Sequence, residues 1–87
     1  MSKYLMVRTV GELSEEAIGA AVERAIEAAG RMPDVRWVRS YFSAEEGKIY
    51  CEYEAPSAEA LFEHARKADI PLDRCTVVQN LEPSMFR

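Results

Sequence analysis

The fold is decided by the stretch from residue 35 to residue 54, which reads VRWVRSYFSAEEGKIYCEYE. Two runs rich in β-branched and aromatic side chains, 35–43 and 48–54, flank a short polar segment that ends in Gly47. Such runs favour β-strands, and a short segment with glycine near its end favours the loop of a hairpin. We therefore predict two antiparallel strands joined by the loop 44–47.

A hairpin loop at 44–47 pairs Ser43 with Lys48, and this pair fixes the register of the hairpin. Side chains alternate between the two sides of a sheet, so each side receives a distinct set. The smaller and more apolar set is predicted to face the core: Phe42 opposite Ile49, Ser40 opposite Cys51, and Val38 opposite Tyr53. The set predicted to face outward carries three aromatic rings: Tyr41 opposite Tyr50, Arg39 opposite Glu52, and Trp37 opposite Glu54.

The remaining elements surround this hairpin in a recognisable order. Residues 4–9 and 74–81 have strand character, and residues 14–30 and 57–69 show helical spacing of apolar residues after a serine cap. The predicted fold is α+β and ferredoxin-like (βαββαβ), a single domain over residues 1–87. Its antiparallel four-stranded sheet would have the order 4-1-3-2, with two helices on one face.

The sheet face away from the helices is predicted to be the interface of a homodimer. On the strand 4–9 we assign Leu5 and Val7 to the core, which leaves Tyr4, Met6 and Arg8 on the open face. Aromatic residues, methionine and arginine are enriched at protein interfaces. The predicted interface consists of Tyr4, Met6, Trp37, Arg39, Tyr41, Tyr50 and Glu52. The alternative is a monomer in which Arg and Glu side chains screen the rings.

Composition restricts the possible partners and the compartment. The chain has 87 residues and a formal net charge of −4, with acidic and basic residues interleaved. Nucleic acid is not expected as a partner, because phosphate binding needs clustered Lys and Arg. No membrane span or signal peptide is apparent, so we expect a cytoplasmic protein. Cys51 and Cys75 are expected to be reduced, since one strand separates theirs and places the sulfurs about 9–10 Å apart.

His64, the only histidine, is the first candidate for chemistry. A helical wheel places it at the rim of the apolar stripe of the second helix. Neutral imidazole is a common metal ligand, and Glu59 and Glu63 lie nearby in sequence. These three residues are the predicted metal ligands. The alternative is an imidazole at the surface edge with no function.

A second candidate site is a small cleft between the sheet and the helices. The register places Cys51 beside Ser40 and Tyr53 on the helix-covered side. A polar cluster is unusual in so small a core. Together with His64, these residues would line a cleft for a small molecule. The alternative is a cysteine thiol that fills space next to Ser40.

Several segments resemble one family of short bacterial proteins. They are Trp37–Tyr41, Lys48, Tyr50–Pro56, Glu63–Ala65 and Pro71–Arg74. In order and spacing they are similar to the DUF4242, nickel-binding-protein-like family. The resemblance implies a ferredoxin-like dimer and, for some members, nickel binding. His64 matches the histidine of the family's second helix and Cys51 the cysteine that follows its aromatic residue, whereas Arg39 stands where members often have histidine.

Three functions therefore remain open from the sequence. The first is a small dimeric protein that binds a divalent transition metal such as nickel. The second is a small-molecule-binding module, or a minor enzyme, that uses the cleft between sheet and helices. The third is a dimeric interaction module whose aromatic face is its whole function. No residue pattern identifies a reaction, so enzymatic activity is left open.

Overall fold

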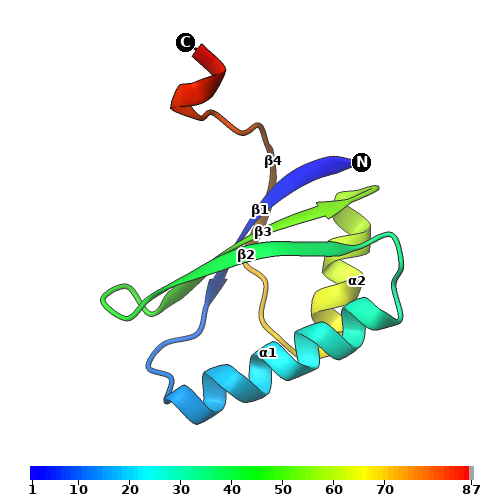
Figure 1. The fold of residues 1–87 in the computed structure, drawn as a ribbon. Coiled ribbons are helices and arrows are strands. Elements are labelled where there is room, and N and C mark those ends of the chain that lie inside the picture. Colours follow the sequence, from blue (N-terminus) through cyan, green and yellow to red (C-terminus); the bar gives the residue numbers. More distant parts are fainter. Residues whose placement is uncertain (87) are drawn as a thin grey trace.

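The computed structural model describes residues 1–86, which form one layer of sheet and one layer of helices (Figure 1). The elements in chain order are β1 (Ser2–Thr9), α1 (Glu15–Gly30), β2 (Arg36–Ser43), β3 (Lys48–Ala55), α2 (Ala58–Ala68), β4 (Arg74–Val78) and a short 3-10 helix (Pro83–Phe86). The sheet has the order β2-β3-β1-β4, and each neighbouring pair is antiparallel. Read from the other edge, this is the predicted order 4-1-3-2. The predicted α+β ferredoxin-like fold is confirmed.

Serine caps start both helices where the sequence predicts them. The Ser14 hydroxyl accepts a hydrogen bond from the backbone N–H of Ala17 at 3.1 Å, and Ser57 accepts one from Ala60 at 3.2 Å. Each bond satisfies a donor that the first helical turn leaves without a partner. None of the helices described is both long enough and apolar enough to cross a membrane.

Gly47 ties the β2–β3 hairpin to the loop that leads into α1. Its carbonyl accepts hydrogen bonds from the backbone N–H groups of Val10 at 2.9 Å and Gly11 at 3.0 Å. Gly47 has φ +66°, and a Cβ atom there would lie 3.0 Å from the Cα of Gly11. Glycine is required at 47 for both reasons. These hydrogen bonds fix the position of the loop that precedes α1.

The two helices cover the same face of the sheet but pack differently. Helix α2 packs against β3, β4 and α1, whereas α1 packs against α2 and stands away from the strands (Figure 1). Four residues of α2 are buried: Leu61, His64, Ala65 and Ala68. In α1 only Ala25 and Ala28 are buried. Helix α1 therefore buries fewer of its side chains than α2 does.

The predicted facing of β1 was wrong. Tyr4, Met6 and Arg8 are buried on the helix-covered side, with exposed fractions of 7%, 0% and 2%. The strand pairs Met6 with Cys51 and Tyr4 with Tyr53, which fixes all four side chains on one face. Leu5 and Val7 consequently lie on the open face. The prediction failed because it gave the core to Leu5 and Val7, although the alternate set on this strand also carries two large apolar side chains.

Trp37 was also assigned to the wrong face, because the strand contains an irregularity. The pairing of β2 with β3 runs regularly from Ser43 to Arg39 and then shifts, so that Trp37 pairs with Tyr53 and Val38 is extra. An extra residue of this kind inverts the facing of the residues beyond it. Trp37 therefore points to the helix-covered side, where Val38 had been predicted. The Ser40–Cys51 and Arg39–Glu52 pairs are confirmed.

Candidate functional site: a cavity between the sheet and α1

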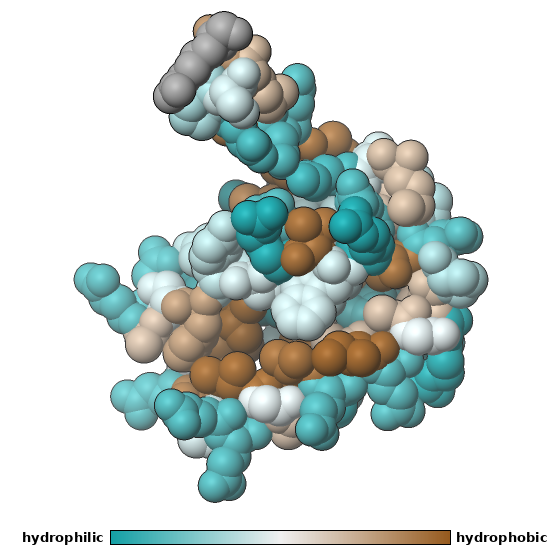
Figure 2. Space-filling model, in the orientation of Figure 1, coloured by the Kyte–Doolittle hydropathy of each residue, from teal (hydrophilic) through white to brown (hydrophobic). Residues whose placement is uncertain are grey.

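A cavity of about 250 Å³ lies between α1 and the β2 side of the sheet. Its floor on α1 is made by Ile18, Ala21, Val22 and Ala25, and the sheet supplies most of the opposite wall. Figure 2 shows the apolar stripe of α1 as a brown band, with a hollow between this band and the side chains of the sheet above it. The cavity can therefore be reached from this side of the molecule.

Small side chains from both layers contribute to the cavity. Ala21 and Ala25 of α1 and Ser40 and Cys51 of the sheet are among the residues that line the space. Helix and sheet approach one another only as closely as their largest side chains allow, so neighbouring small residues leave a void. The cavity therefore leaves apolar side chains of both layers unpacked against one another.

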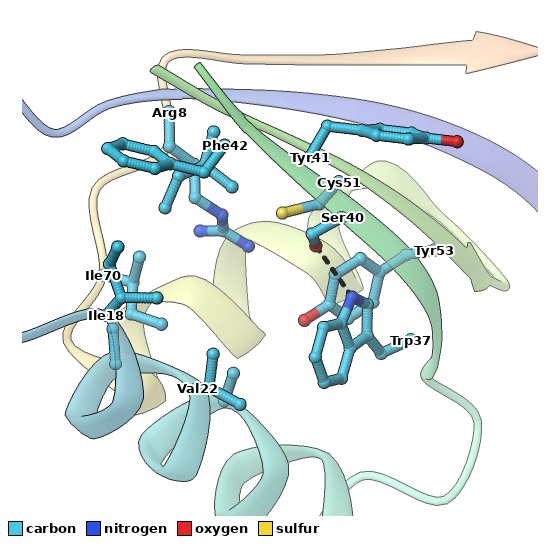
Figure 3. A pocket seen from close by; sticks show the side chains of 13 residues that line it. Arg8, Ile18, Val22, Trp37, Ser40, Tyr41, Phe42, Cys51, Tyr53 and Ile70 are labelled. Carbon is cyan, nitrogen blue, oxygen red and sulfur yellow. Dashed lines mark hydrogen bonds between the residues drawn. The ribbon is translucent and has the colours of Figure 1, made fainter. Parts of the chain in front are cut away.

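Arg8 contributes the one formal charge among the cavity-lining residues (Figure 3). The side chain is only 2% exposed, and its guanidinium points into the cavity. Its Nη1 donates a hydrogen bond to the carbonyl of Pro71 at 2.9 Å, which uses one of the five N–H donors of the group. Among residues 1–86, no carboxylate forms an ion pair with it. A buried charge without a counter-ion is costly.

Trp37 and Ser40 form a polar pair at the wall opposite α1. The indole N–H of Trp37 donates to the Ser40 hydroxyl at 2.8 Å, and this bond spans the irregularity at Val38 (Figure 3). Because the Ser40 oxygen acts as acceptor in this bond, its own hydrogen is available for another partner. The irregular strand thus turns a large aromatic ring and a hydroxyl donor towards the same space.

Tyr53 adds a phenol to the cavity, near Arg8 and Trp37 (Figure 3). Burial raises the pKa of Tyr53 to about 12, and the positive charge of Arg8 acts in the opposite direction. The phenol is therefore neutral at physiological pH and can donate its proton in a hydrogen bond. Cys75, outside the cavity lining, also has a raised pKa, because it too is partly buried.

His64 lies inside the protein rather than at the rim of α2, where the sequence had placed it. It is 0% exposed, its Nε2 lies 3.0 Å from the carbonyl oxygen of Ala25, and its ring centroid is 5.2 Å from that of Tyr53. The Nε2–H is the donor in the contact with Ala25, so Nδ1 is the unprotonated nitrogen. Nδ1 is buried and finds no hydrogen-bond partner among residues 1–86. Burial lowers the pKa of His64, and the charge of Arg8 lowers it further.

The three residues predicted as metal ligands do not come together. Glu63 pairs with Arg66 and Lys67 at the surface, and Glu59 is exposed, whereas His64 is buried against α1. Within the described part of the chain, no group of three or more His, Cys, Asp or Glu residues could hold a metal ion. The donor set of one chain therefore does not fit a nickel ion.

The predicted cleft residues are partly brought together. Ser40, Cys51 and Tyr53 line the cavity, whereas His64 lies behind Tyr53 and is not part of the lining. Arg8 was not predicted as a cavity residue, because the sequence placed it with Tyr4 and Met6 on the open face. The alternation that groups these three residues was correct, so burial of Tyr4 and Met6 carries Arg8 to the helix-covered side.

Four of the predicted interface residues do lie on the open face of the sheet. Tyr41 pairs with Tyr50, and Arg39 pairs with Glu52. The Arg39 Nε is 3.9 Å from Glu52, and the Lys3 Nζ is 3.7 Å from the same carboxylate. Both cysteines are free thiols, as predicted. Met6 pairs with each of them, on either side of β1.

Comparisons with known proteins identify the family. The sequence model of a family described as "Nickel responsive protein SCO4226-like" matches residues 4–78. The chain belongs to this SCO4226-like family. The match supports the broad family assignment made from the sequence; the DUF4242 label itself stays a resemblance.

A solved structure shares the fold of this SCO4226-like chain. The crystal structure of SCO4226 from Streptomyces coelicolor A3(2) has a TM-score of 0.81 and 21% sequence identity, over 93% of this chain and 100% of the other. At this identity the likeness concerns the fold. No curated protein matches the chain significantly.

Proposed function

We propose that this chain is a small-molecule-binding module whose ligand occupies the cavity between α1 and the sheet. The observation that carries the proposal is a cavity of about 250 Å³ with mostly apolar walls and a few polar groups converging on it. Small-molecule sites commonly have this composition. A cavity of about 150 Å³ is large enough to hold benzene. The space here suits a ligand with a single ring or a short branched chain.

The proposal is tested by filling the cavity. Phenylacetamide is a neutral probe of suitable size, and its binding can be followed by calorimetry and by the fluorescence of Trp37, the only tryptophan in the chain. Ala21→Phe places a ring in the cavity and should abolish saturable binding. Ala20→Phe, at an exposed position of the same helix, is the matched control and should leave binding unchanged. Absence of saturable binding of both phenylacetamide and its acid analogue phenylacetate by the native protein, or equal binding by Ala21→Phe, would contradict the proposal.

We also propose a homodimer that forms through the open face of the sheet. The supporting observation is that Tyr41 is 57% exposed there, beside the Arg39–Glu52 pair. Tyr41→Glu should convert a dimer to a monomer in sedimentation velocity, because it buries a charge in an apolar contact. Phe62→Glu removes a 48% exposed ring on α2 and is the control, since it should leave the dimer intact. A monomeric native protein would refute this proposal.

A role in a nickel response is the second candidate function, and the family match over residues 4–78 is the observation that favours it. Since no single chain gathers three donors within the described residues, we propose that two copies supply the ligands together. Native mass spectrometry with added nickel should then show nickel on the dimer alone. A tight nickel adduct on the monomer that His64→Ala abolishes would instead support the site predicted from the sequence.

We propose the cytoplasm as the place where the protein works. Cys51 and Cys75 are both free thiols, and thiols persist in a reducing compartment. Mass spectrometry of protein extracted under alkylating conditions should find both thiols reduced. A substantial fraction of oxidised cysteine would argue for a different compartment.

A further inference from the structure

We infer that the cavity selects an organic monocarboxylate, with Arg8 as the residue that recognises the carboxylate. This inference rests on the proposed function and names the ligand class for the same site. Its starting point is the 2% exposed side chain of Arg8, which enters an otherwise uncharged cavity. A buried guanidinium is stable when an anion accompanies it, and no carboxylate of residues 1–86 does so. The ligand supplies the missing negative charge.

The geometry of Arg8 suits a carboxylate in particular. The bond from Nη1 to the carbonyl of Pro71 holds the guanidinium from one side, and the group points towards the cavity (Figure 3). A guanidinium presents parallel N–H donors that match the two oxygens of a carboxylate. Because the carbonyl of Pro71 anchors the group, little side-chain freedom is lost when the anion binds.

Neighbouring hydroxyl groups complete the polar end of the site. The Ser40 hydroxyl accepts from Trp37 and can donate its own proton, and the Tyr53 phenol stays protonated far above neutral pH. Both point into the space that the Arg8 guanidinium enters (Figure 3). A carboxylate has about four acceptor positions, so it can accept bonds from the guanidinium and from these hydroxyls together. A neutral amide would place an N–H₂ donor against these donors.

The rest of the cavity favours a single negative charge and an apolar body. Ile18 and Val22 of α1 belong to the floor of the cavity. Phe42 and Ile70 close the sides of the cavity (Figure 3). A phosphate monoester carries a charge of about −1.5 to −2 at neutral pH, which one guanidinium does not balance in apolar surroundings. A carboxylate carries a single charge. The ligand is therefore a small carboxylic acid with a ring or a branched chain, bound as its anion.

The test compares ligands of matched size and variants of matched charge. Phenylacetate, phenylacetamide and phenyl phosphate are titrated by calorimetry into the native protein, Arg8→Met and Arg66→Met. Methionine fills much of the arginine volume, and replacing a buried charge by an apolar residue is often neutral or stabilising, so Arg8→Met should fold. Arg66→Met removes one positive charge from the exposed surface of α2, away from the cavity and the open face, and controls for net charge.

We expect the native protein and Arg66→Met to bind phenylacetate at least about tenfold more tightly than phenylacetamide. Arg8→Met should lose this preference while it still binds the amide. Phenyl phosphate should bind more weakly than phenylacetate. If the native protein binds acid and amide equally, or if Arg8→Met keeps the preference, the recognition of a carboxylate by Arg8 is wrong although the cavity still binds ligands. If neither compound binds the native protein, the proposed function itself fails.

Discussion

The two helices cover the same face of one sheet, yet only one of them is packed closely against it. Helix α2 places Leu61 and His64, both 0% exposed, against the sheet and against α1. Helix α1 contributes Ala21 and Ala25 to the lining of the cavity, and the sheet contributes small or polar residues to the same lining. In a domain of this size, the packed half supplies the stability that allows the other half to keep a cavity. The part of the sheet covered by α2 therefore provides stability, and the part covered by α1 provides the proposed binding site.

The two helices should differ most in the free energy of unfolding that is lost when one apolar side chain of each is truncated. Leu61→Ala on α2 should lower the free energy of unfolding by about 2–5 kcal/mol, because the site is fully buried. Val22→Ala in the cavity wall should cost about 1 kcal/mol or less, because Val22 is only half-buried. Urea denaturation of both variants measures the difference. Equal losses would mean that α1 is packed as closely as α2.

A smaller effect is expected where the chain enters α1. Gly47→Ala should destabilise the protein by about 1–2 kcal/mol, since alanine is strained at positive φ and its Cβ would crowd Gly11. Gly47→Ala should also weaken ligand binding in the cavity, because a shift of the backbone at 47 disturbs the carbonyl that holds the loop before α1. Thermal unfolding with and without phenylacetamide separates the two effects. An unchanged melting temperature would show that the loop does not need this contact.

The pH dependence of stability near pH 6 should arise from the closely packed side of the molecule, where His64 of α2 lies. His64 is neutral when folded, because burial lowers its pKa, whereas the unfolded chain titrates near 6.5. Below pH 6.5 the unfolded state binds the extra proton, so the folded state should lose stability between pH 6.5 and 5.5, by at most about 1 kcal/mol. Tyr53, whose ring lies beside His64, stays neutral in this range because burial raises its pKa to about 12.

His64→Gln is the control for this pH dependence. Glutamine does not titrate, so the stability of the variant should be nearly flat between pH 6.5 and 5.5. Urea denaturation at several pH values provides the measurement. The same slope in the variant would assign the effect to another group and would contradict the buried, neutral state of His64.

The smallest expected effect sharpens the comparison from the side of α1. Gly19 lies at an exposed position of this helix, and an added Cβ would meet no atom within 4 Å. Gly19→Ala should therefore stabilise the protein by about 0.5–1 kcal/mol, the usual difference between the two residues inside a helix. Affinity for phenylacetamide should not change. A lower melting temperature would indicate that α1 bends at Gly19 to form the cavity.

The fold could be predicted from the sequence because each element carries its own signal. The serine caps, the helical spacing and the loop ending in Gly47 act locally, and the hairpin register follows from the loop. The errors arose where tertiary context overrides a residue's usual preference. Arg8 is buried because a cavity receives its guanidinium, and His64 is buried because the Ala25 carbonyl accepts from it. The hydrogen-bond acceptors of these two side chains, the carbonyls of Pro71 and Ala25, lie far from them in sequence.

The site was predicted in part for the same reason. Ser40, Cys51 and Tyr53 were placed correctly, since regular alternation holds for them. Trp37 was not, because the extra residue at Val38 leaves no clear mark in the sequence. A metal site at His64 seemed reasonable from its neighbours Glu59 and Glu63. The prediction overlooked that residues adjacent on a helix can point to opposite sides.

The extra residue at Val38 also bears on how such a protein can change during evolution. Insertion or deletion of one codon in an edge strand leaves the strand order intact but exchanges the two faces for every residue before it. In β2 these residues are Arg36 and Trp37, and Trp37 would move from the ligand side to the open side of the sheet. A change of three nucleotides can therefore reassign a large aromatic ring from one surface to the other. The cavity could be gained or lost without a new fold.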